Sequence, residues 1–320
     1  MADNIEKNLV LVGAGGMARS YFDVLVAQSV KFDVVCRSEN TAIRFLRETG
    51  KDIRSGGIEL ALDGSCRYSH AIIATAAEDL SAVAEKVIDA GIPHVLVEKP
   101  GALYLGDLER LEARARAAKV NVYVAYNRRY YASVRKLREL ARADGGIQSL
   151  HFDFTEWSDS IAPLTKGDGV KERWFLANST HVVDLAFFLC GRPLQLSGTT
   201  QGGMPWHPAA SRFAGMGVTE QDVTFTYRAD WDAPGRWGLS IFTKNFKLDL
   251  CPLERLQITS RNSLDSYFEL LDDDLDITFK PGLYRQVASF ILNGAGEELC
   301  SLSEHCRNFR HYLAIGGYVA

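Results

Sequence analysis

The chain has 320 residues, of which 47% are hydrophobic and 24% are charged. At roughly 150 residues per domain this length predicts two domains, and the ordinary composition excludes long disordered or low-complexity segments. Lys and Arg number 36 and Asp and Glu number 40, so the formal net charge is −4. The chain therefore lacks the basic excess typical of nucleic-acid-binding proteins. It also has no run of about 18 apolar residues that would predict a membrane span.

Six cysteines stand at positions 36, 66, 190, 251, 300 and 306. None of them forms a Cys-x-x-Cys pair or has a histidine at zinc-finger spacing, so no metal site is predicted. The polar start of the chain resembles neither a secretory signal nor a transit peptide. We therefore expect a cytoplasmic protein with free thiols, and no nucleic-acid or membrane partner.

Short apolar segments alternate with helical patterns over the first part of the chain. The predicted strands are 8–12, 32–36, 71–74, 94–97 and 120–125, and the predicted helices are 17–27, 41–48, 78–90 and 107–118. Short apolar strands separated by helices indicate a parallel sheet with helices on both faces. Residues 1–125 are accordingly predicted to form a doubly wound Rossmann domain of the α/β class.

The pattern changes after about residue 147. Short strands are predicted at 149–154, 223–227, 237–242, 246–250, 256–259, 267–271 and 275–279, with helices near 180–189, 283–292 and 303–314. A run of strands with few helices between them indicates a mostly antiparallel sheet. Residues 126–320 are therefore predicted to form a second, α+β domain.

The first predicted strand runs into a glycine-rich turn that matches G-x-G-x-x-G/A. Gly13 permits the tight turn, Gly15 lets a pyrophosphate approach the backbone, and Ala18 is small enough for close packing of helix on strand. Gly16 and Met17 open the following helix, whose N-terminal N–H groups would bind the phosphates. The position between a strand and a helix favours a dinucleotide site over a plain turn.

The end of the second strand distinguishes the two nicotinamide dinucleotides. NAD-binding proteins usually place Asp or Glu there, whereas this chain has Arg37 and Ser38. A guanidinium and a hydroxyl suit a 2′-phosphate, so NADP(H) is favoured. Glu39 could still reach a ribose 2′-OH in a longer turn, which leaves NAD(H) possible.

Lys99 follows the predicted strand 94–97 and precedes Pro100. Ligands bind at the carboxyl ends of parallel strands, so its ammonium could donate to a substrate oxygen and stabilise alkoxide character during hydride transfer. The alternative reading is a surface lysine at a strand end.

Four motifs occur in order: the glycine turn, Ile72-Ile73-Ala74-Thr75, Glu98-Lys99-Pro100 and Asn127-Arg128-Arg129-Tyr130. Together they resemble the glucose–fructose oxidoreductase / inositol dehydrogenase / rhizopine catabolism (Gfo/Idh/MocA) family. The resemblance implies NAD(P)-dependent oxidoreduction of a sugar, a cyclitol or a nucleotide sugar, with Lys99 at the reaction centre. It further implies that Thr75, Glu98 and Asn127 contact the cofactor, and that the bond before Pro100 is cis. The large antiparallel sheet of this family is open and often forms the oligomer interface, so a homodimer or homotetramer is expected.

His181 and Asp184 lie three residues apart in the predicted helix 180–189, on one helix face. The resemblance favours His181 as the proton carrier, oriented by Asp184; the alternative is a helix-start histidine with a structural hydrogen bond. Many family members have Asp four residues before this histidine, where this chain has Ala177. Leu80 likewise replaces a common family histidine.

Further residues around this helix are candidates for binding the substrate. Arg128, Arg173, Trp174 and Asn178 are expected to join Lys99 and His181 in that role. Basic and aromatic side chains suit a carboxylate, a phosphate or a nucleotide sugar, although a solvated loop would explain residues 166–174 equally well.

Two alternative functions stay open at this level. One is a hydrolase or lyase of the same family that retains its NAD and recycles it during turnover. The other is a catalytically degraded NADP(H)-sensing protein, which the alanine at position 177 would explain.

Overall fold

The computed structural model describes residues 8–62, 68–292 and 298–319. Cys66, which is predicted to be a free thiol, and the polar residues 1–7 lie outside the described residues. The chain divides into two compact units, Met1–Ala125 with Leu283–Cys306, and Tyr126–Gly282 with Arg307–Ala320. The prediction assigned all of residues 126–320 to the second domain. In the structure, by contrast, the segment Leu283–Cys306 belongs to the first unit.

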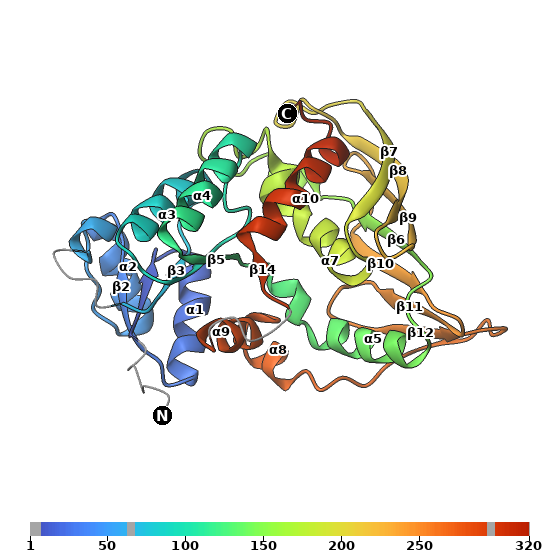
Figure 1. The fold of residues 1–320 in the computed structure, drawn as a ribbon, viewed down its shortest axis with the longest axis horizontal. Helices are drawn as coiled ribbons and strands as arrows, with labels where there is room; N and C mark the ends of the chain where they lie inside the picture. Colours follow the sequence, from blue (N-terminus) through green and yellow to red (C-terminus); the bar gives the residue numbers. More distant parts are fainter. Residues whose placement is uncertain (1–7, 63–67, 293–297, 320) are drawn as a thin grey trace. The chain divides into compact units, whose positions relative to one another are not determined.

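The first unit is built on a six-stranded sheet with the order β14-β5-β4-β3-β1-β2 (Figure 1). Five strands are parallel: β1 (Asn8–Val12), β2 (Lys31–Val35), β3 (His70–Ile73), β4 (His94–Val97) and β5 (Asn121–Val124). The short strand β14 (Cys300–Ser301) adds to β5 in the antiparallel direction. The predicted doubly wound parallel sheet is confirmed, with one antiparallel edge strand that the sequence pattern did not indicate.

Helices connect these strands in the order that the alternating pattern predicts. They are α1 (Gly16–Ala27), α2 (Glu39–Thr49), α3 (Leu80–Asp89) and α4 (Leu105–Ala118). Within the described ranges no helix is long and apolar enough to cross a membrane. The sheet supplies the core, because Ala71, Ile72 and Ile73 of β3 are fully buried, as expected for a strand covered on both faces.

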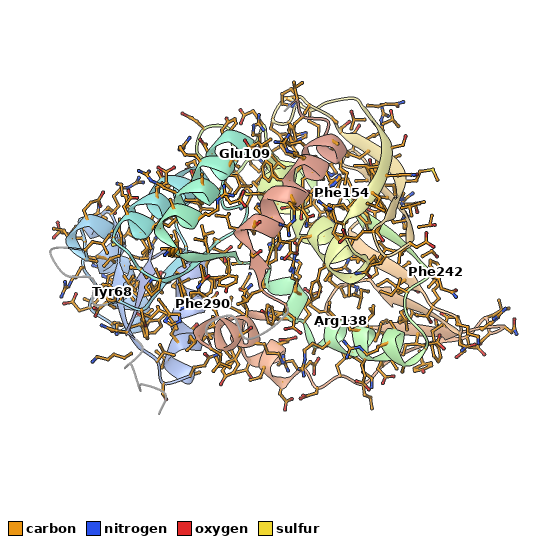
Figure 2. All side chains as sticks on the ribbon, viewed as in Figure 1. Tyr68, Glu109, Arg138, Phe154, Phe242 and Phe290 are labelled. Carbon is orange, nitrogen blue, oxygen red and sulfur yellow. The ribbon has the colours of Figure 1, made fainter. Side chains whose placement is uncertain are left out.

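The returning segment completes the first unit with α9 (Leu283–Ile291) and β14. The Nε2 of Gln28, at the end of α1, donates to the Tyr284 carbonyl at 2.7 Å. Phe290, labelled in Figure 2, is fully buried and packs edge-on against His70 with ring centroids 5.2 Å apart. These contacts explain why the first unit extends beyond the predicted boundary: its sheet and α1 bury apolar surface that only a later segment covers.

The second unit contains an eight-stranded sheet with the order β13-β12-β11-β10-β6-β9-β8-β7. Its strands are β6 (Ser149–Phe154), β7 (Pro193–Gln201), β8 (Arg212–Thr219), β9 (Thr224–Asp230), β10 (Trp237–Phe242), β11 (Phe246–Leu250), β12 (Gln257–Ser260) and β13 (Ser266–Phe268). All neighbours are antiparallel except β6 and β9, which pair in parallel. The predicted mostly antiparallel sheet is confirmed.

Several elements of this unit differ from the sequence pattern. β7, β8 and the helix α5 (Ala132–Ala143) were not predicted, and the predicted strand 275–279 is the short helix α8 (Asp274–Thr278). Asp276 explains the helix, because its carboxylate accepts from the backbone N–H of Ala132 at 2.7 Å and of Gly282 at 2.9 Å. Alternation of Leu275, Ile277 and Phe279 therefore mimics a strand, although none of these side chains is buried.

Aromatic side chains fill the inner face of the large sheet. Phe152 and Phe154 alternate with outward-facing residues along β6 and are fully buried, and Phe154 is labelled in Figure 2. The centroid of the Phe154 ring lies 5.2 Å from that of Phe175 and 6.2 Å from that of Tyr227. Phe175 begins the wide helical turn Phe175–Ser179 that leads into α7 (Thr180–Cys190), so α7 is fixed against β6 and β10.

One ion pair is completely buried in the second unit. The guanidinium of Arg129, in the short helical turn Asn127–Tyr130, donates from Nε to Oδ2 of Asp184 at 2.8 Å and from Nη2 to Oδ1 at 2.6 Å. Each side chain is only 1% exposed. A bidentate pair of this kind joins the turn to α7 with defined geometry.

Removing one charge of this pair should destabilise the protein strongly. We expect Asp184→Asn to lower the free energy of unfolding by about 3–5 kcal/mol, because it leaves the buried Arg129 charge without its counterion. Urea denaturation followed by circular dichroism measures the change. Glu220→Gln, at the half-exposed Arg192–Glu220 pair, is the control and should cost less than about 1 kcal/mol; equal losses in the two variants would contradict the expectation.

Candidate functional site

The glycine turn follows β1 in the first unit and leads directly into α1. Gly13 has φ +118°, and a Cβ there would lie 2.3 Å from the Ala74 carbonyl oxygen, so no other residue fits. A Cβ on Gly15 would meet nothing within 4 Å, which leaves space beside the backbone. Thr75 follows Ala74 at the end of β3, the strand on the other side of β1 from β2.

Among the described residues no side chain caps the N-terminus of α1, where Gly15 precedes Gly16 and Met17. Ala18, in contrast, is fully buried against the sheet. The backbone N–H groups of the first helical turn are thus available to an anion. The open space at Gly15 and the tight contact at Gly13 together fit the pyrophosphate of a dinucleotide.

The two residues predicted to bind a 2′-phosphate, Arg37 and Ser38, have surroundings that differ from each other. The Ser38 hydroxyl caps α2: it accepts from the Thr41 N–H at 3.3 Å and donates to the Thr41 hydroxyl at 2.8 Å. Arg37 is 84% exposed, and its Nη1 lies 3.2 Å from a carboxylate oxygen of Asp79. The hydroxyl is therefore engaged within its own helix, while the guanidinium lies on the surface in a weak ion pair.

Lys99 lies in a turn that is held on both sides within the first unit. Before it, Glu98 is buried and accepts from the Tyr21 hydroxyl at 2.8 Å. After it, the Pro100 carbonyl accepts from Nε2 of the fully buried His305 at 2.9 Å. Burial, and secondarily the Glu98 carboxylate, raises the pKa of Tyr21 well above its ordinary value, so this phenol stays protonated and donates. The Lys99–Pro100 bond is cis, which confirms that expectation.

His181 lies in the first turn of α7, in the second unit, and is 6% exposed. Its ring packs against two aromatic side chains, with centroid distances of 5.7 Å to Tyr126 and 6.2 Å to Trp237. Asp184 follows one turn later, and both of its oxygens accept from Arg129. Asp184 thus serves as the counterion of a buried arginine on the same helix as His181.

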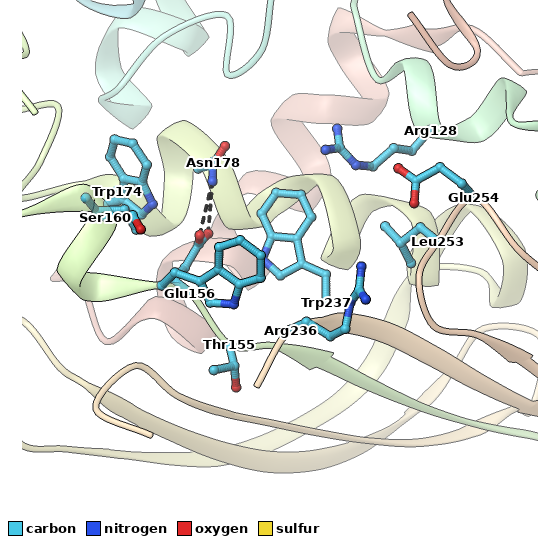
Figure 3. A pocket seen from close by; sticks show the side chains of 12 residues that line it. Arg128, Thr155, Glu156, Ser160, Trp174, Asn178, Arg236, Trp237, Leu253 and Glu254 are labelled. Carbon is cyan, nitrogen blue, oxygen red and sulfur yellow. Dashed lines mark hydrogen bonds between the residues drawn. The ribbon is translucent and has the colours of Figure 1, made fainter. Parts of the chain in front are cut away.

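A cavity of about 290 Å³ opens next to this helix (Figure 3). Its walls include the residues that follow the C-terminal end of β6 and those at the start of β10. The turn that carries Arg128 and the segment before α7 add further walls. The lining residues are Arg128, Thr155, Glu156, Trp157, Ser160, Ile161, Trp174, Asn178, Arg236, Trp237, Leu253 and Glu254. All belong to the second unit, and the volume is close to the lower limit of small-molecule sites, roughly 300 Å³.

Glu156 is the buried carboxylate of this cavity, with 7% exposure. Its two oxygens accept from the Nδ2 of Asn178 at 3.1 and 3.2 Å, drawn as dashed lines in Figure 3. The Ser179 hydroxyl donates to the same carboxylate at 2.6 Å. The acid thereby fixes the two residues that immediately precede α7.

The predicted substrate residues divide into two groups. Arg128, Trp174 and Asn178 line the cavity, with the Arg128 guanidinium 4.7 Å from the Trp237 ring centre. Arg173 and His181 are not part of the lining. The Arg173 guanidinium lies 5.3 Å from the ring centre of Tyr318, and Lys99 belongs to the first unit.

Asn127, predicted to contact the cofactor, is buried in the second unit, and its Nδ2 donates to the Pro281 carbonyl at 2.8 Å. This hydrogen bond connects the turn Asn127–Tyr130 to the end of the segment that follows α8, so the amide has a structural partner.

Sequence reasoning missed the acid and several aromatic and basic residues of the cavity. Glu156 stands two residues after Phe154, in step with the buried positions of β6, which was an available signal. Arg236 and Trp237 are next to it because Trp237 pairs with Phe154 across β6 and β10. No pattern in the sequence reveals that pairing, since these residues are far apart along the chain.

Comparisons with known proteins agree with this architecture. Residues 7–126 match the model of the "Oxidoreductase family, NAD-binding Rossmann fold", Gfo/Idh/MocA. YceM of Salmonella typhimurium, which is named as an oxidoreductase, is 34% identical over 119 residues, and the match spans 37% of this chain and only 36% of YceM.

Solved structures match over nearly the full length. An Agrobacterium radiobacter oxidoreductase in complex with NAD+, L-tartaric acid and magnesium has a TM-score of 0.78 at 16% identity, covering 97% of this chain and 95% of that one. UDP-N-acetylglucosamine 3-dehydrogenase GnnA from Acidithiobacillus ferrooxidans has a TM-score of 0.75 at 16% identity, covering 96% of each chain. The chain thus has the fold of these oxidoreductases throughout, and its residues 7–126 are similar to the Gfo/Idh/MocA oxidoreductase family.

Proposed function

We propose that this protein is an NAD(P)-dependent oxidoreductase that acts on a CH–OH group, or the corresponding carbonyl, of a polyhydroxylated small molecule. The observation that carries the proposal is the turn between β1 and α1, where Gly13 permits the close approach to Ala74 and Gly15 leaves the backbone open. The family match over residues 7–126 supports the same reading.

Gly13, Gly15, Gly16, Met17 and Ala18 are the residues that would hold the pyrophosphate, through the N-terminus of α1. When bound, the nicotinamide supplies or accepts the hydride. In this proposal Thr75 and Glu98 contribute to the same site at the ends of β3 and β4.

Lys99 and His181 have complementary roles in the proposed reaction. The Lys99 ammonium donates a hydrogen bond to the reacting oxygen and stabilises its developing negative charge. His181 takes the hydroxyl proton during oxidation, or returns it during reduction. Asp184 acts as a positioning residue, because Arg129 holds its carboxylate one turn from His181.

The ligands of structural neighbours support a hydroxylated substrate. The Agrobacterium structure contains L-tartaric acid, levoglucosan dehydrogenase is in complex with levoglucosan and NADH, and GnnA acts on UDP-N-acetylglucosamine. All three molecules carry free hydroxyl groups, which is the feature that we transfer to the substrate of this chain.

For the cofactor we propose a preference for NADP(H) over NAD(H). The support comes from Arg37, whose exposed guanidinium follows β2 and could exchange its surface partner Asp79 for a 2′-phosphate. The Ser38 hydroxyl is already hydrogen-bonded to Thr41, which makes it a weaker candidate for binding the phosphate. The proposal therefore depends on Arg37.

We also propose that the outer face of the large sheet forms a homodimer or homotetramer interface. Met216 is 56% exposed and Phe242 is 37% exposed on this face. The strand register places both side chains on the same side of the sheet. Met216 pairs with Thr226, Thr226 with His151, and His151 with Ser240, across β8, β9, β6 and β10. Phe242 is two residues after Ser240 in β10 and therefore faces the same side.

Turnover should depend on both proposed catalytic residues. With a substrate found by nicotinamide absorbance in a panel of sugars and cyclitols, we expect Lys99→Met to reduce kcat about 10²- to 10³-fold. His181→Ala should reduce it about 10²- to 10⁴-fold. Cofactor affinity, measured by nicotinamide fluorescence, should remain near wild type in both variants. Near-normal turnover in both would refute the assigned roles, and cofactor binding without any turnover across the panel would favour a sensing protein.

The cofactor preference can be tested without a substrate. We expect NADPH to bind more tightly than NADH by at least about tenfold, corresponding to one charge-assisted contact with the 2′-phosphate. Arg37→Gln should abolish most of that ratio, while Arg47→Gln on the exposed face of α2 should leave it intact. Equal binding of the two dinucleotides by the wild type would sink the preference.

Light scattering after size exclusion tests the interface. The wild type should elute as a dimer or tetramer, and Met216→Glu should shift it toward the monomer, because a charge at the centre of an apolar interface is costly to bury. Glu139→Gln, on the exposed side of α5, serves as the control. A monomeric wild type would rule the interface out.

A further inference from the structure

One buried hydrogen-bond donor of the cavity in the second unit has no acceptor. Trp174 lines the cavity and is 8% exposed, and in the part of the chain that the structure describes its buried Nε1 has no hydrogen-bond partner. Its ring neighbours carry no acceptor oxygen: the Lys166 Nζ lies 6.0 Å from the ring centre, and the Trp206 ring packs edge-on at 6.2 Å. An indole N–H can only donate, and a buried donor without an acceptor is unfavourable.

The Trp174 nitrogen is directed into the cavity. In Figure 3 it lies on the side of its ring that is turned toward the other lining side chains. An oxygen atom of a ligand in the cavity can therefore supply the acceptor that the protein does not. A ligand group that carries only donors, such as an ammonium, cannot do so.

Trp157 presents a fixed apolar face to the same cavity. It is 63% exposed, yet its Nε1 donates to the Gly235 carbonyl at 2.7 Å. The turn that provides this carbonyl is closely packed, since a Cβ on Gly235 would lie 2.7 Å from Cγ2 of Thr155. The indole therefore keeps its orientation and offers a ligand the face of its ring. Such a face suits the C–H groups of a saturated ring.

Trp237 connects the cavity to the proposed proton carrier. It lines the cavity under the Arg128 guanidinium, at 4.7 Å, and its ring centre lies 6.2 Å from that of His181. Asn178, another lining residue, comes three residues before His181 in the chain. A ligand in the cavity thus contacts the surroundings of His181, as the substrate of the proposed reaction must.

The ionisable side chains of the cavity favour neither an anion nor a cation. Two guanidinium groups and two carboxyl groups line it, those of Arg128, Arg236, Glu156 and Glu254. In Figure 3 Glu254 lies on the same side of the cavity as Arg128. An ionic ligand would lose hydration on entering without meeting an excess of the opposite charge, which is unfavourable. The lining therefore suits an uncharged ligand.

We propose that Trp174 and Trp157 determine the specificity of this cavity, and that it binds an uncharged single-ring polyol, that is, a neutral monosaccharide or a cyclitol. The Trp174 Nε1 donates to a ligand oxygen, and the C–H face of the ring packs on Trp157. The volume of about 290 Å³ fits one ring rather than a nucleotide sugar. This inference rests on the proposed function and narrows its substrate class.

Calorimetric titration of the full chain tests the charge and the size of the ligand. The probes are D-glucose, D-galactose and D-mannose, each against its uronate and its 2-amino sugar, and myo-inositol against its 1-phosphate. UDP-glucose is the nucleotide-sugar arm. We expect at least one neutral ring to bind, and to bind at least about tenfold more tightly than its charged analogues and than UDP-glucose.

The indole resonances report the proposed hydrogen bond directly. The chain has five tryptophans, and in ¹⁵N-tryptophan-labelled protein the indole N–H signal of Trp174 is the one that Trp174→Phe removes. We expect the neutral ring to move this proton signal downfield, because accepting a hydrogen bond deshields the proton. Trp231, whose Nε1 already donates to the Phe154 carbonyl at 3.2 Å and which does not line the cavity, is the internal control and should stay in place.

Two variants separate the contributions of donor and ring face. Trp174→Phe keeps an aromatic ring and should weaken the neutral ligand about three- to tenfold, as for one hydrogen bond. Trp157→Ala, at an exposed position where folding is not at risk, should weaken it about tenfold or more. Tyr267→Ala removes an aromatic side chain that is 54% exposed on β13 and is the matched control. Circular dichroism confirms the fold of each variant.

Three results would overturn the inference: a charged analogue that binds as tightly as its neutral parent, no binding of any neutral ring, or a Trp174 signal that stays in place on binding. Failure of the proposed function is distinguishable, because these titrations contain no nicotinamide. Binding of a neutral ring without nicotinamide turnover would contradict the oxidoreductase and support the ligand class. Turnover confined to charged sugars or nucleotide sugars would do the reverse.

Discussion

The arrangement of the second unit depends on the buried pair between Arg129 and Asp184. Two charges at 1% exposure are tolerated because each neutralises the other through two short hydrogen bonds. The pair joins the turn that carries Arg128 to the helix that carries His181. Arg128 comes directly before Arg129, and His181 lies one turn before Asp184. The pair therefore fixes the position of Arg128, which lines the cavity, relative to His181, the proposed proton carrier.

Glu156 makes a second connection of this kind, at the other end of the same helical segment. Its hydrogen bonds to Asn178 and Ser179 hold the residues that lead into α7. The family resemblance places an acid at position 177, and this chain has alanine there. The carboxyl group of Glu156, at the end of β6, contacts the very next residue, Asn178. An acid therefore lies beside the start of the helix, although it comes from another element.

Local patterns predicted the parts of the fold that depend on local chemistry. Apolar strands and the glycine turn identified the parallel sheet, and the run of short strands after residue 147 identified the mostly antiparallel one. The sequence could also have pointed to Glu156, which continues the alternation of the buried Phe152 and Phe154. It could not place Arg236 and Trp237 beside it, because strand pairing between distant segments has no local signature. Asp276 shows the opposite failure. Its carboxylate binds the backbone N–H groups of Gly282, nearby in the sequence, and of Ala132, far from it, so a helix forms where alternation alone predicts a strand.

The return of Leu283–Cys306 to the first unit has a consequence for the proposed chemistry. His305 belongs to this segment, is fully buried, and donates to the Pro100 carbonyl next to Lys99. Tyr21, from the helix that follows the glycine turn, holds Glu98 on the other side of the same lysine. A flexible ammonium gains most in catalysis when its backbone is fixed before the substrate arrives. The late segment therefore does more than cover apolar surface, since His305 also holds the turn that carries Lys99.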